Sequence, residues 1–287
     1  MLEKPTVTVF GSCRVHTPCT LLRNAGRVSM NQKNIFGYTH YTSEILQQFA
    51  LISGGKAPPQ RLRPYLNIPD YWQEPPRRAD SHEAFHEAFA DTDLFVVEVS
   101  SVRRLLFKAV YLQINRVREL LVGEDEKLLR QWWNPLVRSG DNNAIRQGIN
   151  WPTPLQQEIG PVIESSEQGV EELVADMRRI KTYLRKPVLF VSHFNTDYKG
   201  VSIPQRQLII DAMRVMMGDG HCGFYDPSLD VLTAGLETSI QDLGHYKVAF
   251  EPLIADRLHA QMELLLRAAS KPATKHKAAV LPADISV

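Results

Sequence analysis

Short runs of apolar and β-branched residues, separated by long intervals, constrain the fold of this chain most strongly. Three of them cover residues 6–10, 93–99 and 188–192, and a shorter fourth covers 222–225. Strands that are apolar on both faces are typical of a parallel sheet with helices on each side. The alternation of these runs with helical patterns therefore predicts an α/β fold, a doubly wound parallel sheet.

Helical spacing of apolar residues fills most of the intervals, while 56–80 is rich in proline and arginine and is predicted to be ordered but irregular. The predicted helices cover 43–52, 81–90, 104–122, 124–138, 165–184, 204–217 and 246–269, with further helical character after Pro18. We expect one α/β domain over residues 1–269, with a helical insertion at about 104–160. The Lys/Ala/Pro-rich tail, 270–287, is expected to be disordered.

Charge and cysteine content narrow the function classes. Lys and Arg number 33 against 32 Asp and Glu, a net charge of +1 that gives no support for a nucleic-acid partner. No run of 18 apolar residues is present, so we expect no membrane span. The N-terminus lacks the pattern of a secretory signal, and three cysteines are too few for a disulfide framework. These features predict a cytoplasmic protein.

The turn Gly11-Ser12-Cys13 follows the first predicted strand and leads into a helix. In an open parallel sheet, ligands collect at the carboxyl ends of the strands. A thiol at the positive end of a helix is favoured as thiolate, and Arg14 adds a cation beside it. We therefore predict that Cys13 is the reactive centre of an enzyme.

A second polar motif, Asp242-Leu243-Gly244-His245, comes just before the last predicted helix. An Asp three residues before a His can orient the imidazole, which then takes a proton from a nucleophile. This spacing predicts Cys13 as nucleophile, His245 as base and Asp242 as the residue that orients it. His16 is an alternative base because it is close to Cys13 in sequence.

The two motifs, in this order, resemble those of the SGNH (GDSL-type) hydrolase superfamily. In that family the nucleophile follows the first strand in a Gly-Asp-Ser turn, and an Asp-x-x-His motif is near the C-terminus. The resemblance puts Cys13 in the nucleophile position, and it implies that Asn34 and Gly37 lie in the region that supplies an oxyanion-hole glycine. The family's Gly-x-Asn-Asp motif is missing, because Val99-Ser100-Ser101-Val102-Arg103 stands in its place.

The chain resembles the WcbI-type polysaccharide biosynthesis proteins more closely. The residues that carry this resemblance are Val9-Phe10-Gly11-Ser12-Cys13-Arg14-Val15, Asp226-Pro227-Ser228 and Asp242-Leu243-Gly244-His245-Tyr246. It implies an acetyltransferase that uses coenzyme A, with acetyl-CoA as acyl donor and a carbohydrate hydroxyl of a capsular polysaccharide as acceptor. Either an acetyl-Cys13 intermediate or direct activation of the sugar by His245 is compatible with it.

A coenzyme A donor carries phosphates and would need cations and polar groups near Cys13. The candidates follow the predicted strands or lie beside the nucleophile, and no Gly-rich phosphate loop is present. They are Ser12, Arg14, Gly37, Ser100, Arg103, Arg104, Lys108, His193 and Lys199, with Asn195 as a further pocket-lining candidate.

Three alternatives compete with this interpretation. The segment His82-Glu83-Ala84-Phe85-His86 matches the H-E-x-x-H pattern of zinc sites, although an amphipathic helix with Phe85 packed inward explains it more simply. An SGNH-type esterase or deacetylase would use water as acceptor. A non-catalytic protein that binds sugars or nucleotides would have no use for the thiol.

Overall fold

The computed structural model describes residues 4–270, except 34, 71, 74–80, 146, 218, 220 and 221. The predictions for Asn34 and for the tail from residue 271 lie outside the described residues, as does the side chain of His82.

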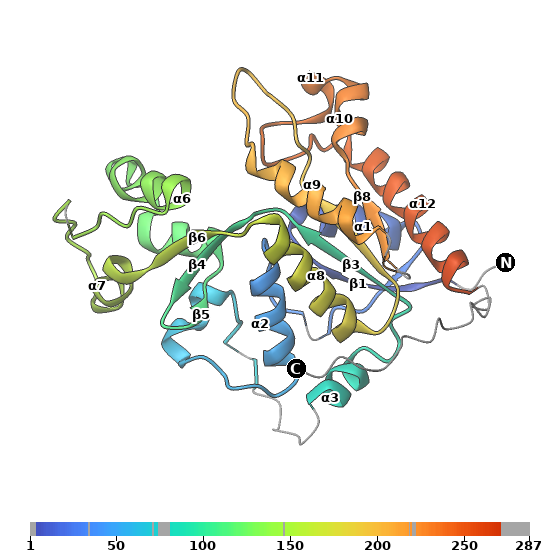
Figure 1. Cartoon of the computed structure of the whole chain (residues 1–287), viewed down its shortest axis with the longest axis horizontal. Coiled ribbons are helices and arrows are strands. Elements are labelled where there is room, and N and C mark those ends of the chain that lie inside the picture. Colours follow the sequence, from blue (N-terminus) through green and yellow to red (C-terminus); the bar gives the residue numbers. More distant parts are fainter. Residues whose placement is uncertain are drawn as a thin grey trace, which may run out of the picture.

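A five-stranded parallel sheet forms the centre of the fold, which confirms the predicted α/β class (Figure 1). Its strands are β1 (Thr6–Phe10), β2 (Ser29–Met30), β3 (Leu94–Val99), β7 (Val188–Ser192) and β8 (Cys222–Tyr225), in the order β2-β1-β3-β7-β8. The short β2 was not predicted. Because the strand order reverses between β1 and β3, their carboxyl ends form the crevice where ligands bind in open α/β sheets.

Helices cover both faces of this sheet (Figure 1). One face packs against α1 (Cys13–Asn24), α10 (Ser228–Ala234) and α12 (Glu251–Ala269). The other packs against α2 (Thr42–Ile52), α3 (Ser81–Ala88), α8 (Val170–Leu184) and α9 (Gln205–Met216). Every residue of β3 and β7 is buried, as the apolar runs predicted.

The region predicted as a helical insertion also contributes to a second, three-stranded antiparallel sheet. This sheet consists of β4 (Arg103–Phe107), β5 (Val110–Tyr111) and β6 (Glu164–Glu167), in the order β5-β4-β6. The predicted helix at 104–122 is therefore wrong over its first part, where Leu105 and Phe107 alternate with less buried residues as in a strand. The helix predicted at 165–184 begins only at Val170, because β6 precedes it.

Short helical pieces complete this region and the connections. They are η1 (Gln60–Leu66), α4 (Ile114–Val117), η2 (Arg118–Val122), α5 (Glu126–Leu128), η3 (Leu129–Trp133), α6 (Asn134–Ser139), α7 (Pro154–Ile159), η4 (Gly160–Val162) and α11 (Leu236–Ser239).

Two predicted helix starts also need correction. The first helix begins at Cys13 rather than after Pro18, because Ser12 caps it. The last helix begins at Glu251 rather than at 246, with Pro252 in its first turn. In the part of the chain that the structure describes, none of the helices combines the length and apolar character needed to cross a bilayer.

Candidate active site

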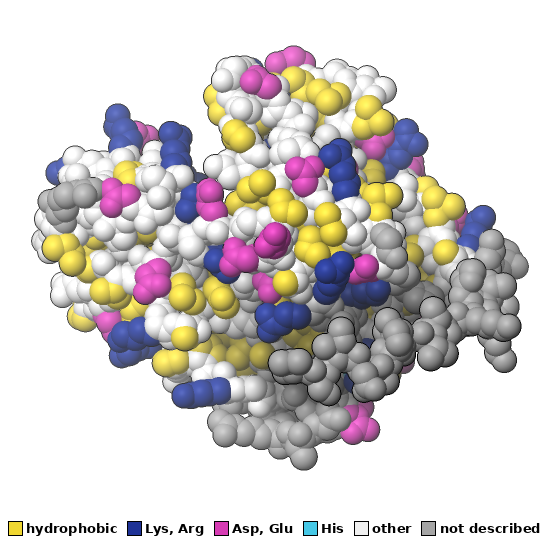
Figure 2. Space-filling model, viewed as in Figure 1, with side chains coloured by type: hydrophobic (Ala, Val, Ile, Leu, Met, Phe, Trp, Pro, Cys, Tyr) yellow, Lys and Arg dark blue, Asp and Glu magenta, His cyan; other side chains and the backbone are white. Residues whose placement is uncertain are grey.

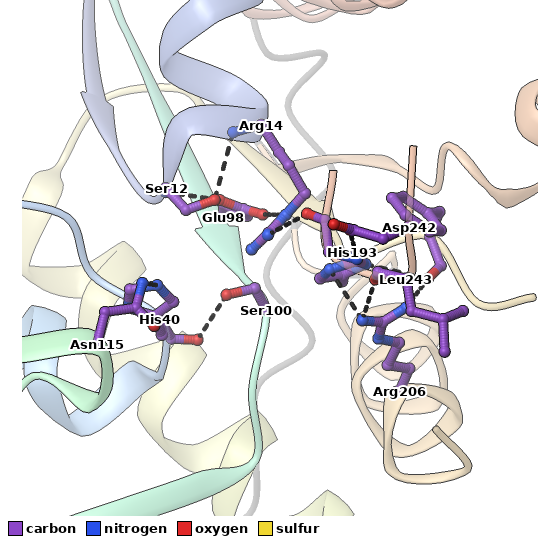
Figure 3. Close-up of polar contacts among 12 residues, drawn as sticks. Ser12, Arg14, His40, Glu98, Ser100, Asn115, His193, Arg206, Asp242 and Leu243 are labelled. Atoms are coloured by element: carbon purple, nitrogen blue, oxygen red, sulfur yellow. Dashed lines mark hydrogen bonds and ion pairs between the residues drawn. The ribbon is translucent and has the colours of Figure 1, made fainter. Parts of the chain in front are cut away.

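A buried carboxylate, Glu98, holds the turn that carries Cys13 (Figure 3). The backbone N–H and the hydroxyl of Ser12 both donate to Glu98 Oε2 at 2.6 Å, and Arg14 Nε donates to Oε1 at 2.8 Å. Glu98 is fully buried in β3. Although burial acts to raise the pKa of Glu98, Arg14 and Ser12 hold it below its usual value, so the carboxylate is ionised.

Gly11 makes this contact between β1 and β3 possible. A Cβ at position 11 would lie 2.6 Å from Glu98 Cβ and 2.6 Å from Val15 Cγ2. Both distances are shorter than any van der Waals contact. The glycine of the turn is therefore required by the close approach of the two strand ends.

Ser12 organises the first turn of α1. Its hydroxyl accepts from Arg14 N at 3.3 Å, and its carbonyl accepts from the N–H groups of Val15 and His16 at 3.2 and 3.1 Å. Cys13 N–H has no acceptor among the residues that the structure describes. An N–H that is free at a helix start can stabilise a thiolate or an oxyanion beside it.

Arg14 also links α1 to the loop that carries His245. Its Nη1 donates to Gly244 O at 2.8 Å, across a separation of 230 residues in sequence. The loop is closed at its base by a bridge between Ile240 and Tyr246. The two predicted motifs therefore lie at the same edge of the sheet.

A buried arginine, Arg206 of α9, also contacts this loop (Figure 3). Its Nη2 donates to Leu243 O at 2.6 Å and lies 3.0 Å from Nε2 of His193, while its Nη1 donates to Phe194 O at 2.9 Å. His193 Nδ1 is 3.0 Å from the same carbonyl. Both nitrogens of His193 therefore have partners within the protein, and burial lowers its pKa well below the usual value, so the imidazole is neutral.

Asp242 and His245 contact each other as their spacing predicts. His245 Nδ1 lies 3.0 and 3.1 Å from the two carboxylate oxygens, and Gly244 N donates to Oδ1 at 2.6 Å. Partial burial acts to raise the pKa of Asp242, but Gly244 and His245 lower it below its usual value. An ionised Asp242 favours a proton on Nδ1, which leaves Nε2 of the exposed ring to accept one.

The thiol of Cys13 is half-buried, and its protonation differs from the expectation. Burial raises its pKa, and the lowering effect of Arg14 is opposed by Glu98. The backbone N–H of Cys13 at the helix start acts with Arg14 to lower the pKa, in the predicted direction, but burial outweighs both. Cys13 has no hydrogen bond to an imidazole among the described residues, so a base must approach the thiol during the reaction.

His16 stays an alternative base. It lies one turn after Cys13 on α1, its ring centroid is 5.4 Å from that of Tyr38, and its Nε2 is buried without a partner in the described part of the chain. Burial lowers the pKa of His16, with Glu98 acting in the opposite direction. A neutral imidazole at this position can accept a proton.

A cleft with a volume of about 750 Å³ lies next to this site, although neither Cys13 nor His245 is among its lining residues. Figure 2 shows the surface hollowed between the lobe that holds α6 and the projection formed by α10, α11 and the loop before α9. Its lining includes Ser100, which directly follows β3, and Arg206, which is hydrogen-bonded to another lining residue, Leu243 of the loop that carries His245 (Figure 3). Its other walls combine apolar residues with arginines, among them Val102, Ile114, Trp133, Val137, Val201, Ile203, Arg103, Arg118 and Arg138.

The predicted phosphate ligands divide between different faces. Arg103 lines the cleft, pairs with Glu167 and has a buried Nε without an acceptor in the described residues. Because side chains alternate along β4, Arg104 points away and contacts Ser166 and Glu172. Lys108 lies in the β4–β5 turn and pairs with Glu158, so neither Arg104 nor Lys108 is in the cleft.

The other predicted residues lie nearer to the cleft or to the turn. Ser100 lines the cleft, but its backbone N–H donates to His40 O at 2.8 Å and so is not a free oxyanion donor. Lys199 is exposed in the loop before α9, close in sequence to lining residues 201–203. Gly37 has a φ of +69°, and a Cβ there would lie 2.5 Å from Asn67 Nδ2. Asn195 hydrogen-bonds Gln207 at 3.1 Å.

The segment that matches the H-E-x-x-H zinc pattern lies within α3. Glu83 and His86 lie on α3, while the side chain of His82 is not described. Within the described ranges, no group of three or more His, Cys, Asp or Glu is arranged to hold a metal ion. Phe85 packs inward against Phe49 and Phe89, as the amphipathic interpretation predicts.

Sequence reasoning did not find Glu98, Arg206, Arg118 or Arg138. Glu98 carries a visible signal, since it is the only charged residue in an apolar strand, and a carboxylate is rarely fully buried without a partner. The three arginines lie in helical segments of ordinary composition, where nothing in the sequence distinguishes them from surface residues.

Comparison with known proteins gives one family match and one relative. A family model described as the TviD N-terminal domain matches residues 5–261. The chain is 31% identical to the Vi polysaccharide biosynthesis protein TviD of Salmonella typhi over 110 residues. These residues make up 38% of the chain and 12% of the relative. No solved structure matches the chain. The resemblance to WcbI-type proteins stays a prediction, while the relative's name agrees with its broader theme of polysaccharide biosynthesis.

Proposed function

The chain belongs to the family of TviD N-terminal domains, and from this premise we propose that it transfers an acetyl group from acetyl-CoA to a sugar hydroxyl in capsular polysaccharide biosynthesis. The name of the Salmonella typhi relative supports a polysaccharide as the acceptor. The aligned segment covers a small part of that relative, so activity and substrates are proposed here on the geometry of this chain.

One observation carries the proposal. Arg14, the neighbour of Cys13, donates to the carbonyl of Gly244, the neighbour of His245. A thiol at a helix start and an Asp-oriented imidazole are the parts needed for nucleophilic acyl transfer. They lie at the carboxyl edge of the sheet, at the point where the strand order reverses.

These residues divide the reaction into two steps. Cys13 Sγ gives its proton to His245 Nε2 and attacks the thioester carbonyl; the acetyl group moves to sulfur, and His245 returns the proton to the leaving thiolate of coenzyme A. A sugar hydroxyl then gives its proton to His245 and takes the acetyl group, and Cys13 recovers the proton. Cys13 N–H is suited to stabilise the oxyanion in both steps.

The cleft fits a donor with an aliphatic arm and phosphates. Apolar side chains such as Val102, Trp133 and Val201 would contact the arm. Arg118 and Arg138 line the cleft and have no ion pair in the described part of the chain, which leaves their guanidinium groups available for phosphate. The donor supplies an acetyl group that is already activated as a thioester.

An assay in which the protein is incubated with acetyl-CoA and capsular oligosaccharides tests the proposal. The release of coenzyme A is measured, and the acetylated product is identified by chromatography. We expect sustained release only with an acceptor, and a loss of about a thousandfold or more in Cys13→Ala and His245→Ala. Cys222→Ser is the matched control, because Cys222 lies in β8 away from the turn.

Other outcomes would replace the proposal. Steady hydrolysis of a simple acetyl ester without coenzyme A would identify an esterase. Binding of sugars or nucleotides with no reaction, unaltered in Cys13→Ser, would identify a non-catalytic binding protein.

A further inference from the structure

Glu98 is a buried charge that the two-step chemistry does not use. It accepts three hydrogen bonds, two from Ser12 and one from Arg14. We propose that Glu98 is a positioning residue: through Arg14 it holds the Cys13 turn and the His245 loop in one fixed geometry. This inference rests on the roles proposed for Cys13 and His245, and it is independent of the identity of the acyl donor.

Stability alone does not explain Glu98. The other residues of β3 are apolar and buried, so an apolar side chain would suit position 98 as well. Taking a carboxylate and a guanidinium out of water costs about as much as their attraction returns, and buried ion pairs are often replaced by apolar residues without loss. The pair at Glu98 and Arg14 therefore calls for a reason other than stability, and the geometry of the two motifs supplies one.

Arg14 is suited to this task because its two contacts point to different segments. Nε donates to Glu98 Oε1 at 2.8 Å, and Nη1 donates to Gly244 O at 2.8 Å. The guanidinium group is planar and rigid, so fixing one end also fixes the other. A lysine would keep the charge but has a single nitrogen, which cannot reproduce both contacts in this fork geometry.

The loop would depend on this bridge for its position. The side chain of His245 is 57% exposed, so packing contributes little to its placement. Arg206 holds the loop at Leu243 O, two residues before His245, and Arg14 holds it at the adjacent Gly244 O. A displacement of about 1 Å between reacting groups can cost about a hundredfold in rate.

Charge and position can be separated experimentally because the two residues act on the Cys13 thiol in opposite directions. Arg14 lowers the pKa of Cys13, and Glu98 raises it. Arg14→Lys keeps the charge and loses the bridge, so the pH midpoint of Cys13 alkylation should stay near that of the wild type. Glu98→Gln should move the midpoint to lower pH while acyl transfer slows about a hundredfold. A folded Glu98→Gln variant that lowers the midpoint but keeps the wild-type rate of acyl transfer would contradict the positioning role.

A double-mutant cycle on Cys13 alkylation tests the inference without any acyl donor. The rate of iodoacetamide reaction at pH 7 is measured at Cys13 by peptide mass spectrometry in wild type, Arg14→Lys, His245→Ala and the double variant. If Arg14 positions His245, each single change slows alkylation about tenfold or more and the double variant is no slower than the slower single one. Arg23→Lys, at the exposed end of α1, is the matched control.

The inference would be overturned if the two single changes slowed alkylation of Cys13 independently, so that their effects add in the double variant. It would also be overturned if Arg14→Lys were alkylated at the wild-type rate. Thermal unfolding of each variant identifies loss of folding, and if Glu98→Gln fails to fold, the Arg14→Lys cycle decides alone. Coupled losses without transfer from acetyl-CoA would reject the proposed donor and keep the positioning role. Additive effects on alkylation together with intact acetyl transfer would reject the positioning role and keep the proposed donor. An unchanged rate of Cys13 alkylation in His245→Ala would reject the pairing of Cys13 with His245, on which both the proposed function and the positioning role depend.

Discussion

The Cys13 thiol is controlled by burial and by two charges of opposite sign. Burial raises its pKa, Arg14 lowers it and Glu98 raises it again. A cysteine that is protonated at rest is protected from oxidation and becomes a nucleophile only when a base removes its proton. This fits a reaction in which His245 takes the thiol proton as Cys13 attacks an electrophile.

The pH dependence of Cys13 alkylation follows from this raised pKa. A free thiol is half ionised at about pH 8.5, so in His245→Ala, where no base assists, the Cys13 rate should still rise above that pH. Cys222, whose pKa is raised to about 11, and buried Cys19, at about 12, should react later. Peptide mass spectrometry of the three cysteines measures this order. A Cys13 rate that levels off below about pH 7.5 would indicate a preformed thiolate and contradict the assignment.

Sequence could predict the residues that share a local motif, but not those that meet through the fold. Asp242 and His245 are three residues apart, so their contact follows from spacing. Glu98 meets Ser12 across 86 residues and Arg14 meets Gly244 across 230. Contacts at such separations depend on which strands become neighbours, and short motifs carry no information about that.

At the scale of elements, the main sheet was predictable and the small sheet was not. Apolar strands such as β3 and β7 have a strong sequence signal. The β4–β5 hairpin lacks one, because its two-residue turn consists of Lys108 and Ala109, both with positive φ (47° and 65°). Such turns normally contain Asn-Gly or Asp-Gly, and without that signal Leu105 and Leu106 suggest a helix.

The same hairpin gives a stability prediction. Ala109→Gly should raise the free energy of unfolding by up to about 1 kcal/mol, because a left-handed residue with a Cβ is strained and glycine is not. Ala175→Gly, in the middle of α8, is the control and should lower it by about 0.5–1 kcal/mol. Urea denaturation measures both. A destabilised Ala109→Gly variant would mean that the turn is not under strain.

At the scale of the whole molecule, the cleft lies between the segment that carries β4 and α6 and the segment that carries α9. Residues from β4, α4, α6 and the loop before α9 line it, so no single segment of sequence describes it. This explains why only Ser100 and Arg103 of the predicted ligands line it, while Arg104 and Lys108 point elsewhere.

The arginines of the cleft should affect donor binding and leave the thiol chemistry unchanged. Replacing both Arg118 and Arg138 by Ala should raise KM for acetyl-CoA about tenfold or more with little change in kcat, since each guanidinium loses a charge-assisted contact with phosphate. Arg130→Ala, which removes an exposed arginine paired with Glu126, is the matched control. Initial-rate kinetics measure the effect. An unchanged KM would place the donor outside this cleft.

Trapping of an acetyl group on Cys13 is the most direct test of the proposed chemistry. The protein is mixed with acetyl-CoA without acceptor, quenched in acid and digested, and each cysteine peptide is examined by mass spectrometry. We expect one acetyl group on the Cys13 peptide of the wild type and of Cys222→Ser, and much slower labelling in His245→Ala than in His16→Ala. Turnover to acetylated sugar with no label on Cys13 at any quench time would contradict a role for this thiol as the nucleophile.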